Sequence, residues 1–450
     1  MKRSFIRGNI TLQRKKTCPS LFGKLQSTGA GFVRAEGNYC MQMKGAKKQG
    51  LGSTSVHHRR NRIRLLVAGA SILFLVLVAV LAIMPAAFPA FGANMADFLR
   101  LIFGPQPVAR LESTSFKLHD ELNRFLYKGG KPQIAWNYST QLGTFSSGGA
   151  PKLASPIAHN KLSLLGSDVV SASPQIGWQA YGPSVNGVPV LARAMLTLDP
   201  HRPYAGVALV RMDLSQIELH IMPGYLEPAH PAQLAQVIPA PGVIPPSDQN
   251  YLVAAFNGGF KAVHGHYGMM VAGVTLLPPI PNIATVAIYR DGHVQIGAWG
   301  KEIVPSSNII AFRQNCPPLL EAGQLNPNLL INNEGAWGYT ANTDITWRTA
   351  LGITQDGRYL IYAVGNGSSA ATLAQALQNA GAYSAMQLDI NQYYAHFNTY
   401  QPVTGSAASQ RFQLTGEPLL DKMINIPHLY LTPSVRDFFY LTVPAPSSAQ

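Results

Sequence analysis

The chain has 450 residues, 47% of them hydrophobic, and its 35 lysines and arginines against 21 acids give a formal charge of +14. Residues 1–64 carry 15 of the basic residues and one acid, Glu36, so this tail contributes 15 − 1 = +14 and the remainder is electroneutral. A nucleic-acid groove needs lysine and arginine clustered on the folded part, so nucleic acid is excluded as the main partner. The composition is too apolar for a disordered protein and allows a large core.

An uncharged apolar run, LLVAGASILFLVLVAVLAI, follows the tail from Leu65 to Ile83. A helix over this run would be about 28 Å long, close to the ~30 Å hydrocarbon core of a bilayer. We therefore predict a single-pass transmembrane anchor over 65–84 in the cell membrane. Because arginines flank its N-terminal side, the basic tail 1–64 is expected to be cytoplasmic and disordered, and the main domain extracytoplasmic.

The alternative to an anchor is a cleaved signal peptide, because small residues follow the apolar run at 84–93. A translation start at Met41 or Met43 would give such a peptide a more ordinary basic leader. The sequence leaves both alternatives open.

Beyond the predicted anchor, apolar residues recur at helical spacing over 97–127, with Phe116, Leu118, Leu122 and Phe125 between charged positions. This spacing predicts a membrane-proximal helix that would act as a stalk. Residues 128–175 are rich in glycine, serine and proline, which is typical of a linker or an irregular surface segment.

Short β-rich runs alternate with turn signals over 176–440. Apolar runs flank Asp291-Gly292 and Asp356-Gly357, and an Asp-Gly pair between such runs predicts a hairpin because its turn needs positive φ. The runs 205–214 and 217–222 are predicted to pair in the same way.

One helix is predicted over 371–380, capped by Ser368 or Ser369 and ended by Gly381. It leads into a strand over 384–388. The predicted fold class is therefore α+β: a strand-rich mixed-sheet domain with a few helices, preceded by one transmembrane helix.

A polar turn, Asn257-Gly258-Gly259, directly follows the apolar run 251–256. Two glycines after a buried strand allow the backbone to approach a ligand, and the Asn257 amide could hold a sugar hydroxyl or a phosphate oxygen. An ordinary strand-end turn is the alternative. In the loop that follows, His264 is a candidate substrate-facing residue; it forms an H-x-H pair with His266, but no third ligand stands at a spacing typical of metal sites.

The acids of the domain can be sorted by their surroundings, because a glycosidase needs carboxyl groups. Glu334 and Asp344 lie in polar loop-like segments, and Asp389 stands at the end of a predicted strand, where site residues are common. Solvated loop acids are the alternative for Glu334 and Asp344. Arg348 precedes another strand and could hold a phosphate through a bidentate pair, or form a structural ion pair with an acid such as Asp344.

The ordered series of these segments resembles one known family. In chain order the segments are AAFNGGF, YRDGHVQI, WRTALGITQDGRYLIYAV, TLAQALQNAGA and SAMQLD. Over roughly residues 205–435 they resemble the phosphodiester glycosidase domain family, which includes the uncovering enzyme of lysosomal mannose-phosphate tagging and bacterial exported proteins. Asn257, Gly258, Arg348 and Asp389 match the family's motif positions. The family's Asp-Gly-Gly-Gly-Ser-like loop is replaced here by Asp389 followed by Ile390-Asn391-Gln392-Tyr393.

The resemblance implies hydrolysis of a sugar-1-phosphodiester. Combined with the predicted anchor, it gives a membrane-anchored extracytoplasmic glycosidase acting on a cell-surface glycan or glycoconjugate, and no cofactor or metal is expected. Asp389, Glu334 and Arg348 are the expected catalytic residues, with Asn257, Gly258, Gly259, His264 and Asn391 expected to bind substrate.

Two other classes of function stay open. A non-catalytic glycan-binding or envelope-polymer-binding module of the same fold is favoured by the altered 390–393 loop. A scaffold that acts through the basic tail is suggested by the charge of that tail.

Overall fold

The computed structural model describes residues 69, 89–127, 129, 134–137, 143–146, 149–153, 176–228, 238, 240–402 and 413–444. The predicted basic tail and, apart from Gly69, the predicted anchor at 65–84 lie outside the described residues. Within the described part of the chain, no helix is both long and apolar enough to cross a membrane. Strands predominate and helices are few, which confirms the strand-rich class.

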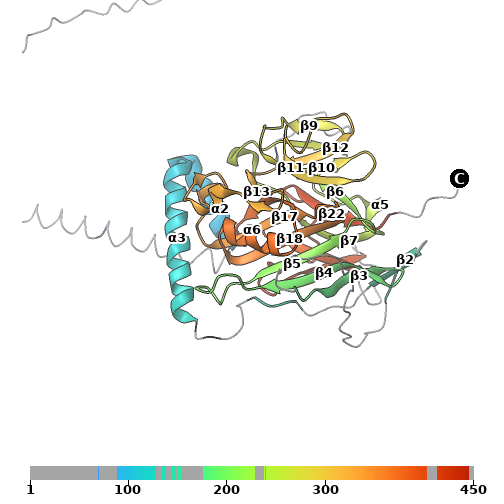
Figure 1. Ribbon diagram of the computed structural model, residues 1–450, viewed down its shortest axis with the longest axis horizontal. Helices are drawn as coiled ribbons and strands as arrows, with labels where there is room; N and C mark the ends of the chain where they lie inside the picture. Colours follow the sequence, from blue (N-terminus) through green and yellow to red (C-terminus); the bar gives the residue numbers. More distant parts are fainter. Residues whose placement is uncertain are drawn as a thin grey trace, which may run out of the picture. The chain divides into compact units, whose positions relative to one another are not determined.

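A large, almost wholly antiparallel sheet forms the centre of the domain (Figure 1). Every neighbouring pair except β1 and β3 is antiparallel. In spatial order its ten strands are β14 (Gln324–Leu325), β13 (Pro318–Glu321), β19 (Ser384–Ile390), β17 (Thr346–Ile353), β18 (Tyr359–Ser368), β5 (Val207–Asp213), β4 (Val188–Leu196), β3 (Gln179–Val185), β1 (Gly143–Ser146) and β2 (Gly149–Leu153).

Two five-stranded sheets and one strand pair accompany the large sheet. The first has the order β21 (Leu414–Pro418), β20 (Phe397–Pro402), β7 (Leu252–Asn257), β22 (Phe438–Thr442) and β6 (Glu218–Met222). The second has the order β11 (Val294–Ala298), β10 (Ala284–Tyr289), β12 (Ile309–Gln314), β8 (Met269–Val271) and β9 (Val274–Leu277). The pair consists of β15 (Glu334–Gly335) and β16 (Gly338–Ala341).

The core lies on both faces of the large sheet, as the alternation along β18 shows. Tyr362 and Val364 belong to the main apolar cluster, which also contains residues of β7 and β22, whereas Ile361 and Ala363 pack in a second cluster with helix α6 (Ala370–Asn379). Successive side chains of a strand point to opposite faces, so a strand buried on both sides is apolar throughout. The sheet is therefore covered by β-structure on one side and by α6 on the other.

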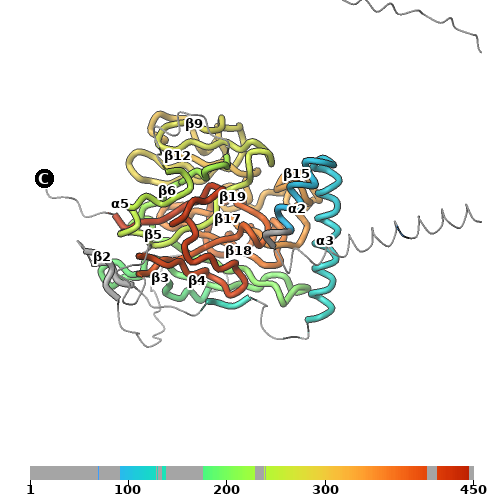
Figure 2. The backbone as a smooth tube through the Cα atoms, turned by 180° about the vertical axis from the view of Figure 1, so that it is seen from behind, coloured from blue at the N-terminus to red at the C-terminus, as the bar shows by residue number. Residues whose placement is uncertain are grey.

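The helices α2 (Pro89–Phe103) and α3 (Pro105–Leu126) occupy the stretch where one stalk helix was predicted. They are separated by Gly104, whose φ of 81° and following proline end the first helix. Figure 1 shows α3 along one side of the sheets, and Figure 2 shows α2 beside β15. Arg100 of α2 packs over the ring of Tyr339 in β16, so these helices contact the domain.

Three short helices complete the elements of the residues that the structure describes: α5 (Pro246–Gln249), η1 (Ala262–His264) and η2 (Pro327–Leu330). Predictions from local signals are confirmed for both Asp-Gly hairpins, β10–β11 and β17–β18, and for α6, where the Ser369 side chain accepts a hydrogen bond from the Thr372 amide. The predicted pairing of 205–214 with 217–222 is wrong, because β5 pairs with β4 and β18 while β6 joins β22 in another sheet.

Candidate active site

The candidate site forms where two sheets meet at the ends of β7 and β19. Thr349 of β17 joins them, because its hydroxyl accepts a hydrogen bond from Asn257 Nδ2 (2.9 Å) and donates one to the Asp389 carbonyl (2.8 Å). Strand β22 brings the chain back to this place, because its first residue, Phe438, lies opposite Asn257. Arg436 stands two residues before this strand. Residues far apart in the sequence thus reach one place.

Asp389 and Arg436 form a salt bridge at this place. Arg436 Nη2 lies 2.6 Å from Asp389 Oδ2, and the side chains are 13% and 7% exposed respectively. The same Nη2 donates to the Gly259 carbonyl at 2.6 Å, while Asp389 Oδ1 accepts from the Ile390 amide at 2.8 Å. The pair therefore connects the glycine turn after β7 with the end of β19.

Burial raises the pKa of Asp389 to about 6, although the positive charge of Arg436 opposes the shift. A carboxyl group in water titrates near pH 4, so burial moves the ionisation of Asp389 toward neutral pH. A pKa near the working pH is what a group needs in order to exchange protons with a reacting molecule.

A second cation and an aromatic ring adjoin the salt bridge. The Tyr394 ring has Arg436 Cζ 4.5 Å from its centroid and Lys261 Nζ 5.6 Å from it. Lys261 itself forms a salt bridge with Asp97 of α2. Two cations, Lys261 and Arg436, thus lie together with two acids, Asp97 and Asp389, and an anionic ligand would compete with these acids for the cations.

His264 lies next to this group, at the end of η1. Its Nε2 is 3.9 Å from Asp97 Oδ1, and its ring meets the Tyr339 ring edge-on with centroids 4.9 Å apart. Burial lowers the pKa of His264 to about 3, so the imidazole is neutral near pH 7. The structure therefore offers His264 as a neutral hydrogen-bonding group.

The Asn257 amide is occupied within the protein. Its Nδ2 donates to the Gly258 carbonyl and to Thr349, and its Oδ1 accepts from the Tyr362 hydroxyl and the His396 amide. The residue is 5% exposed. This placement favours the structural alternative for Asn257, a strand-end turn held by hydrogen bonds.

The two glycines of the same turn are explained by internal packing. A Cβ at Gly258 would lie 2.1 Å from Asp437 Oδ2, and one at Gly259 would lie 3.1 Å from Asn315 Oδ1. Asp437 forms a buried salt bridge with Arg313, 2.8 Å from Nε to Oδ2, so it has little room to move. The Gly259 carbonyl nevertheless belongs to the site, because it binds Arg436.

Arg348 does not face the Asp389–Arg436 pair. It is fully buried, and its donors bind the carbonyls of Trp337, Ala341, Asp344 and Ser368 and the side chain of Gln387. Its backbone lies opposite Ile390, but its guanidinium supports the segment that contains β15 and β16. This placement argues against the predicted phosphate contact. The alternative, an ion pair with Asp344, is replaced by a hydrogen bond to the Asp344 carbonyl.

Glu334 and Asn391 belong to separate segments, the strand pair β15–β16 and the turn after β19. Glu334 is exposed on β15, in the strand pair whose Gly338 faces the Ile390 side chain. Asn391 has a φ of 96°, which suits asparagine and glycine. Its Oδ1 accepts from the Tyr393 amide at 3.0 Å and closes a local turn, so the loop keeps a glycine-like conformation without glycine.

Sequence reasoning missed Arg436, Lys261 and Tyr394. Arg436 belongs to the dipeptide Arg436-Asp437 just before a buried strand, and Lys261 follows the glycine turn directly. Arg436 and Lys261 could have been found as charged residues close to strand ends, the criterion that identified Asp389. Among the described residues, no group of three or more histidine, cysteine or acidic side chains could hold a metal ion.

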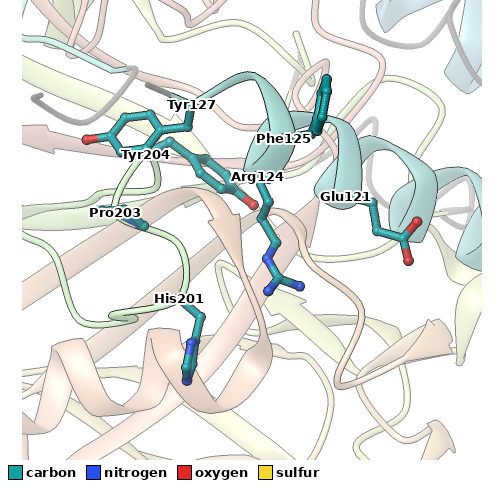
Figure 3. A pocket seen from close by; sticks show the side chains of 7 residues that line it. All are labelled: Glu121, Arg124, Phe125, Tyr127, His201, Pro203 and Tyr204. Carbon is teal, nitrogen blue, oxygen red and sulfur yellow. The ribbon is translucent and has the colours of Figure 1, made fainter. Parts of the chain in front are cut away.

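A separate pocket of about 440 Å³ lies at the C-terminal end of α3 (Figure 3). Its lining comes from α3 and from the turn before β5 and consists of Glu121, Arg124, Phe125, Tyr127, His201, Pro203 and Tyr204. None of these residues takes part in the contacts of Asp389 described above, so this pocket is distinct from the candidate site.

The family model described as phosphodiester glycosidase matches residues 250–389. The match begins just before β7 and ends at Asp389, so it contains the glycine turn and the carboxylate of the site, while Arg436 lies beyond it. The resemblance to this family predicted from the sequence is thereby confirmed. No curated protein sequence matches the chain significantly.

Three solved structures show a distant likeness. The catalytic domain of zebrafish N-acetylglucosamine-1-phosphodiester α-N-acetylglucosaminidase, auto-inhibited by its pro-peptide, is 15% identical, with 57% of this chain and 84% of that chain covered and a TM-score of 0.37. A hypothetical protein from Synechocystis is 11% identical, with 61% and 64% covered and a TM-score of 0.37. A putative exported protein from Burkholderia pseudomallei is 12% identical, with 53% and 74% covered and a TM-score of 0.26.

Proposed function

We propose that this chain is a membrane-anchored, extracytoplasmic glycosidase that hydrolyses a sugar-1-phosphodiester of a cell-surface glycan or glycoconjugate. The observation that carries the proposal is the salt bridge between Asp389 and Arg436, which lies at the end of the segment matched by the family. The membrane location depends on the apolar run at 65–84 and the charge of the tail before it.

In the proposed reaction, Arg436 and Lys261 hold the phosphodiester. A guanidinium binds phosphate oxygens through directed hydrogen bonds, and an ammonium adds a point charge. Arg436 Nε has no hydrogen-bond partner among the described residues, but this atom is buried, so a phosphodiester would be held by the outer nitrogens of the guanidinium. These cations take the role that the sequence assigned to Arg348.

Asp389 would act on the water molecule that attacks the sugar. The water oxygen bonds to C1 as the bond between C1 and the phosphate oxygen breaks, and the phosphate monoester leaves with the bonding electron pair. The proton of the water passes to the Asp389 carboxylate. A phosphate is already a good leaving group, so a second carboxyl group such as Glu334 is not required for its departure.

The direct test is hydrolysis of a panel of α- and β-linked hexose-1-phosphate alkyl diesters by the full chain in ¹⁸O-labelled water. A glycosidase places the label in the free sugar, whereas a phosphodiesterase places it in the phosphate. Asp389→Asn should lower kcat by about 100-fold or more, as expected for loss of a group that transfers a proton. Asp356→Asn, in an exposed hairpin turn, should leave the rate unchanged. Label in the phosphate, or an unaffected Asp389→Asn rate, would refute the assignment.

A non-catalytic glycan-binding module is the second candidate. It is supported by the engagement of both Asp389 oxygens, one with Arg436 and one with the Ile390 amide. It predicts saturable binding of the same diesters by calorimetry with no turnover, and equal binding by Asp389→Asn.

A further inference from the structure

A strip of large apolar side chains runs along α3 on its solvent side. Leu118, Leu122, Phe125 and Leu126, here called the apolar strip, are 48%, 51%, 84% and 55% exposed. At about 100° per residue these four side chains fall within about 100° of the helix circumference. Single exposed apolar residues are ordinary on protein surfaces, but a continuous strip of this kind marks an interaction surface.

The face of α3 that contacts the domain lies opposite to the strip. Ala109 is buried, the Ser113 hydroxyl donates to Asp344 Oδ2, and Asp120 forms a salt bridge with Arg202 at 2.7 Å. On a helical projection these residues point about 180° away from Leu118. From residue 117 to Leu126 the strip's side of α3 is exposed, whereas in the first turns Val108 and Leu111, which project on the same side, are buried and half-buried. The contact of the later turns with the domain, through Asp120, lies on the opposite face.

One flank of the strip is basic. Arg110, Lys117 and Arg124 are exposed and fall within about 40° of one another on the helical projection. Glu121 is the acid on that flank, since Asp120 is neutralised by Arg202. Apolar side chains bordered by lysine and arginine are characteristic of helices that lie in the interface of an anionic membrane.

The position of these helices in the chain points to the same partner. α2 begins at Pro89, five residues after the end of the predicted anchor at 84, so its first residue can lie at most about 17 Å from that end. Helix α2 exposes further large apolar side chains, Phe98, Leu101, Ile102 and Phe103. An inserted anchor would hold both helices at the bilayer surface.

We propose that the apolar strip of α3 lies in the interface of an anionic lipid bilayer, with the helix parallel to the membrane and the domain behind it. This inference rests on the proposed anchor and replaces the upright stalk predicted from the sequence. An upright α3 of 22 residues would extend about 33 Å and leave Phe125 in water. In the parallel arrangement, the pocket beside Phe125 gives an anionic headgroup space next to Arg124 (Figure 3).

The test measures the membrane depth of position 125 in the full chain. Cys18→Ser and Cys40→Ser remove the tail thiols, buried Cys316 stays, and Phe125→Cys carries a spin label. The chain is reconstituted in vesicles of phosphatidylcholine and phosphatidylglycerol. The matched control is Val304→Cys, which is 64% exposed and far from α3 in the sequence. We expect contact with a water-soluble nickel chelate to be at least about threefold lower at position 125 than at 304, and contact with oxygen, which concentrates in hydrocarbon, to be higher.

Equal nickel contact at both positions would overturn the proposal. The proposal would also be overturned if position 125 were shielded from nickel with spin–spin broadening and no gain in oxygen contact. That result would mean that a second copy of the chain covers the strip. In the labelled chain, Leu118→Glu with Leu122→Glu should restore nickel contact without lowering the melting temperature, since both side chains are exposed. Val188→Glu, at a similarly exposed site, should not.

Protease protection of the basic tail reports insertion of the anchor separately, and hydrolysis of the diesters on the same vesicles reports the activity. Shielding at position 125 without tail protection would support the lipid surface while refuting the anchor. Shielding without hydrolysis would support the lipid surface while refuting the proposed reaction.

Discussion

Arg436 Nη2 binds Asp389 Oδ2 and the Gly259 carbonyl at the same distance, 2.6 Å. One guanidinium, two residues before the last strand β22, thus joins the end of β19 to the turn after β7. Burial of Asp389 raises its pKa, and the positive charge of Arg436 opposes that rise.

The activity should depend on pH through Asp389. A base must be ionised, and burial raises the pKa of Asp389 to about 6, so kcat/KM should rise as the pH increases through about 6 and then level off. Burial lowers the pKa of His264 to about 3 and of His396 to about 4, so neither should titrate in this range. Arg436→Gln removes the opposing charge and should move the midpoint to higher pH. A pH–rate profile checks both, and a profile that falls with rising pH would assign Asp389 as an acid instead.

Removing the carboxylate of Asp97 should strengthen substrate binding. Asp97 of α2 forms a salt bridge with Lys261, so Asp97→Asn leaves one more uncompensated cation near the Asp389–Arg436 pair. For an anionic diester we expect KM to fall about threefold to tenfold at low salt with kcat unchanged, and the gain to shrink as salt rises. Asp213→Asn, which breaks a salt bridge with the exposed side chain of Arg358 and touches none of these residues, is the control and should leave KM as it is. An unchanged KM for Asp97→Asn would remove Lys261 from the binding site.

Gly258→Ala should destabilise the domain severely. The new Cβ would lie 2.1 Å from Asp437 Oδ2, and the Asp437 carboxylate is fixed by its buried salt bridge with Arg313. We expect a loss of about 3 kcal/mol in the free energy of unfolding, the upper range for overpacking a rigid site. Gly177→Ala has no atom within 4 Å of the new Cβ and should change stability by about 0.5 kcal/mol or less. Chemical denaturation of the two variants gives the comparison.

His396 should make the domain sensitive to acid. Burial lowers its pKa to about 4, so between pH 6.5 and pH 4 the unfolded chain binds a proton that the folded chain does not. Stability is therefore lost as the pH falls, by about 2 kcal/mol from this residue between pH 7 and pH 5. His396→Gln should remove that part of the pH dependence, whereas His293→Gln, with an exposed side chain, should not. Denaturation curves at the two pH values measure the difference, and parallel losses for wild type and His396→Gln would contradict it.

Local signals carried the correct predictions of the fold, and non-local pairing caused the error. The β17–β18 hairpin and helix α6 follow from residues that are neighbours in sequence, such as Gly357 in its turn and Ser369 at its cap. The assignment of β5 and β6 to one hairpin failed because their partners come much later in the chain, where Tyr362 pairs with Val210 and Tyr440 with His220. Distance along the sequence hides such partners.

The site shows the same limit. Asp389 was predicted because an acid at a strand end is visible in the sequence, whereas its partner Arg436 is 47 positions further along. Arg348 was chosen as the cation because it precedes a strand, but the structure turns its guanidinium into the interior. Which arginine meets the carboxylate is decided by how the strands of two sheets converge.

Arg436 and Asp437 are consecutive, yet they bind partners on different sides of the chain: Asp389 for the first and Arg313 for the second. A slip of one residue in β22 would bring Asp437 to Asp389 and Phe438 to Arg313, or, in the other direction, Arg436 to Arg313 and Val435 to Asp389. Either slip would set one pair of like charges together in a buried place, where repulsion is strong, and leave the other charge opposite an apolar residue. The opposite charges of Arg436 and Asp437 thus favour one register of β22, because a shifted register loses both salt bridges.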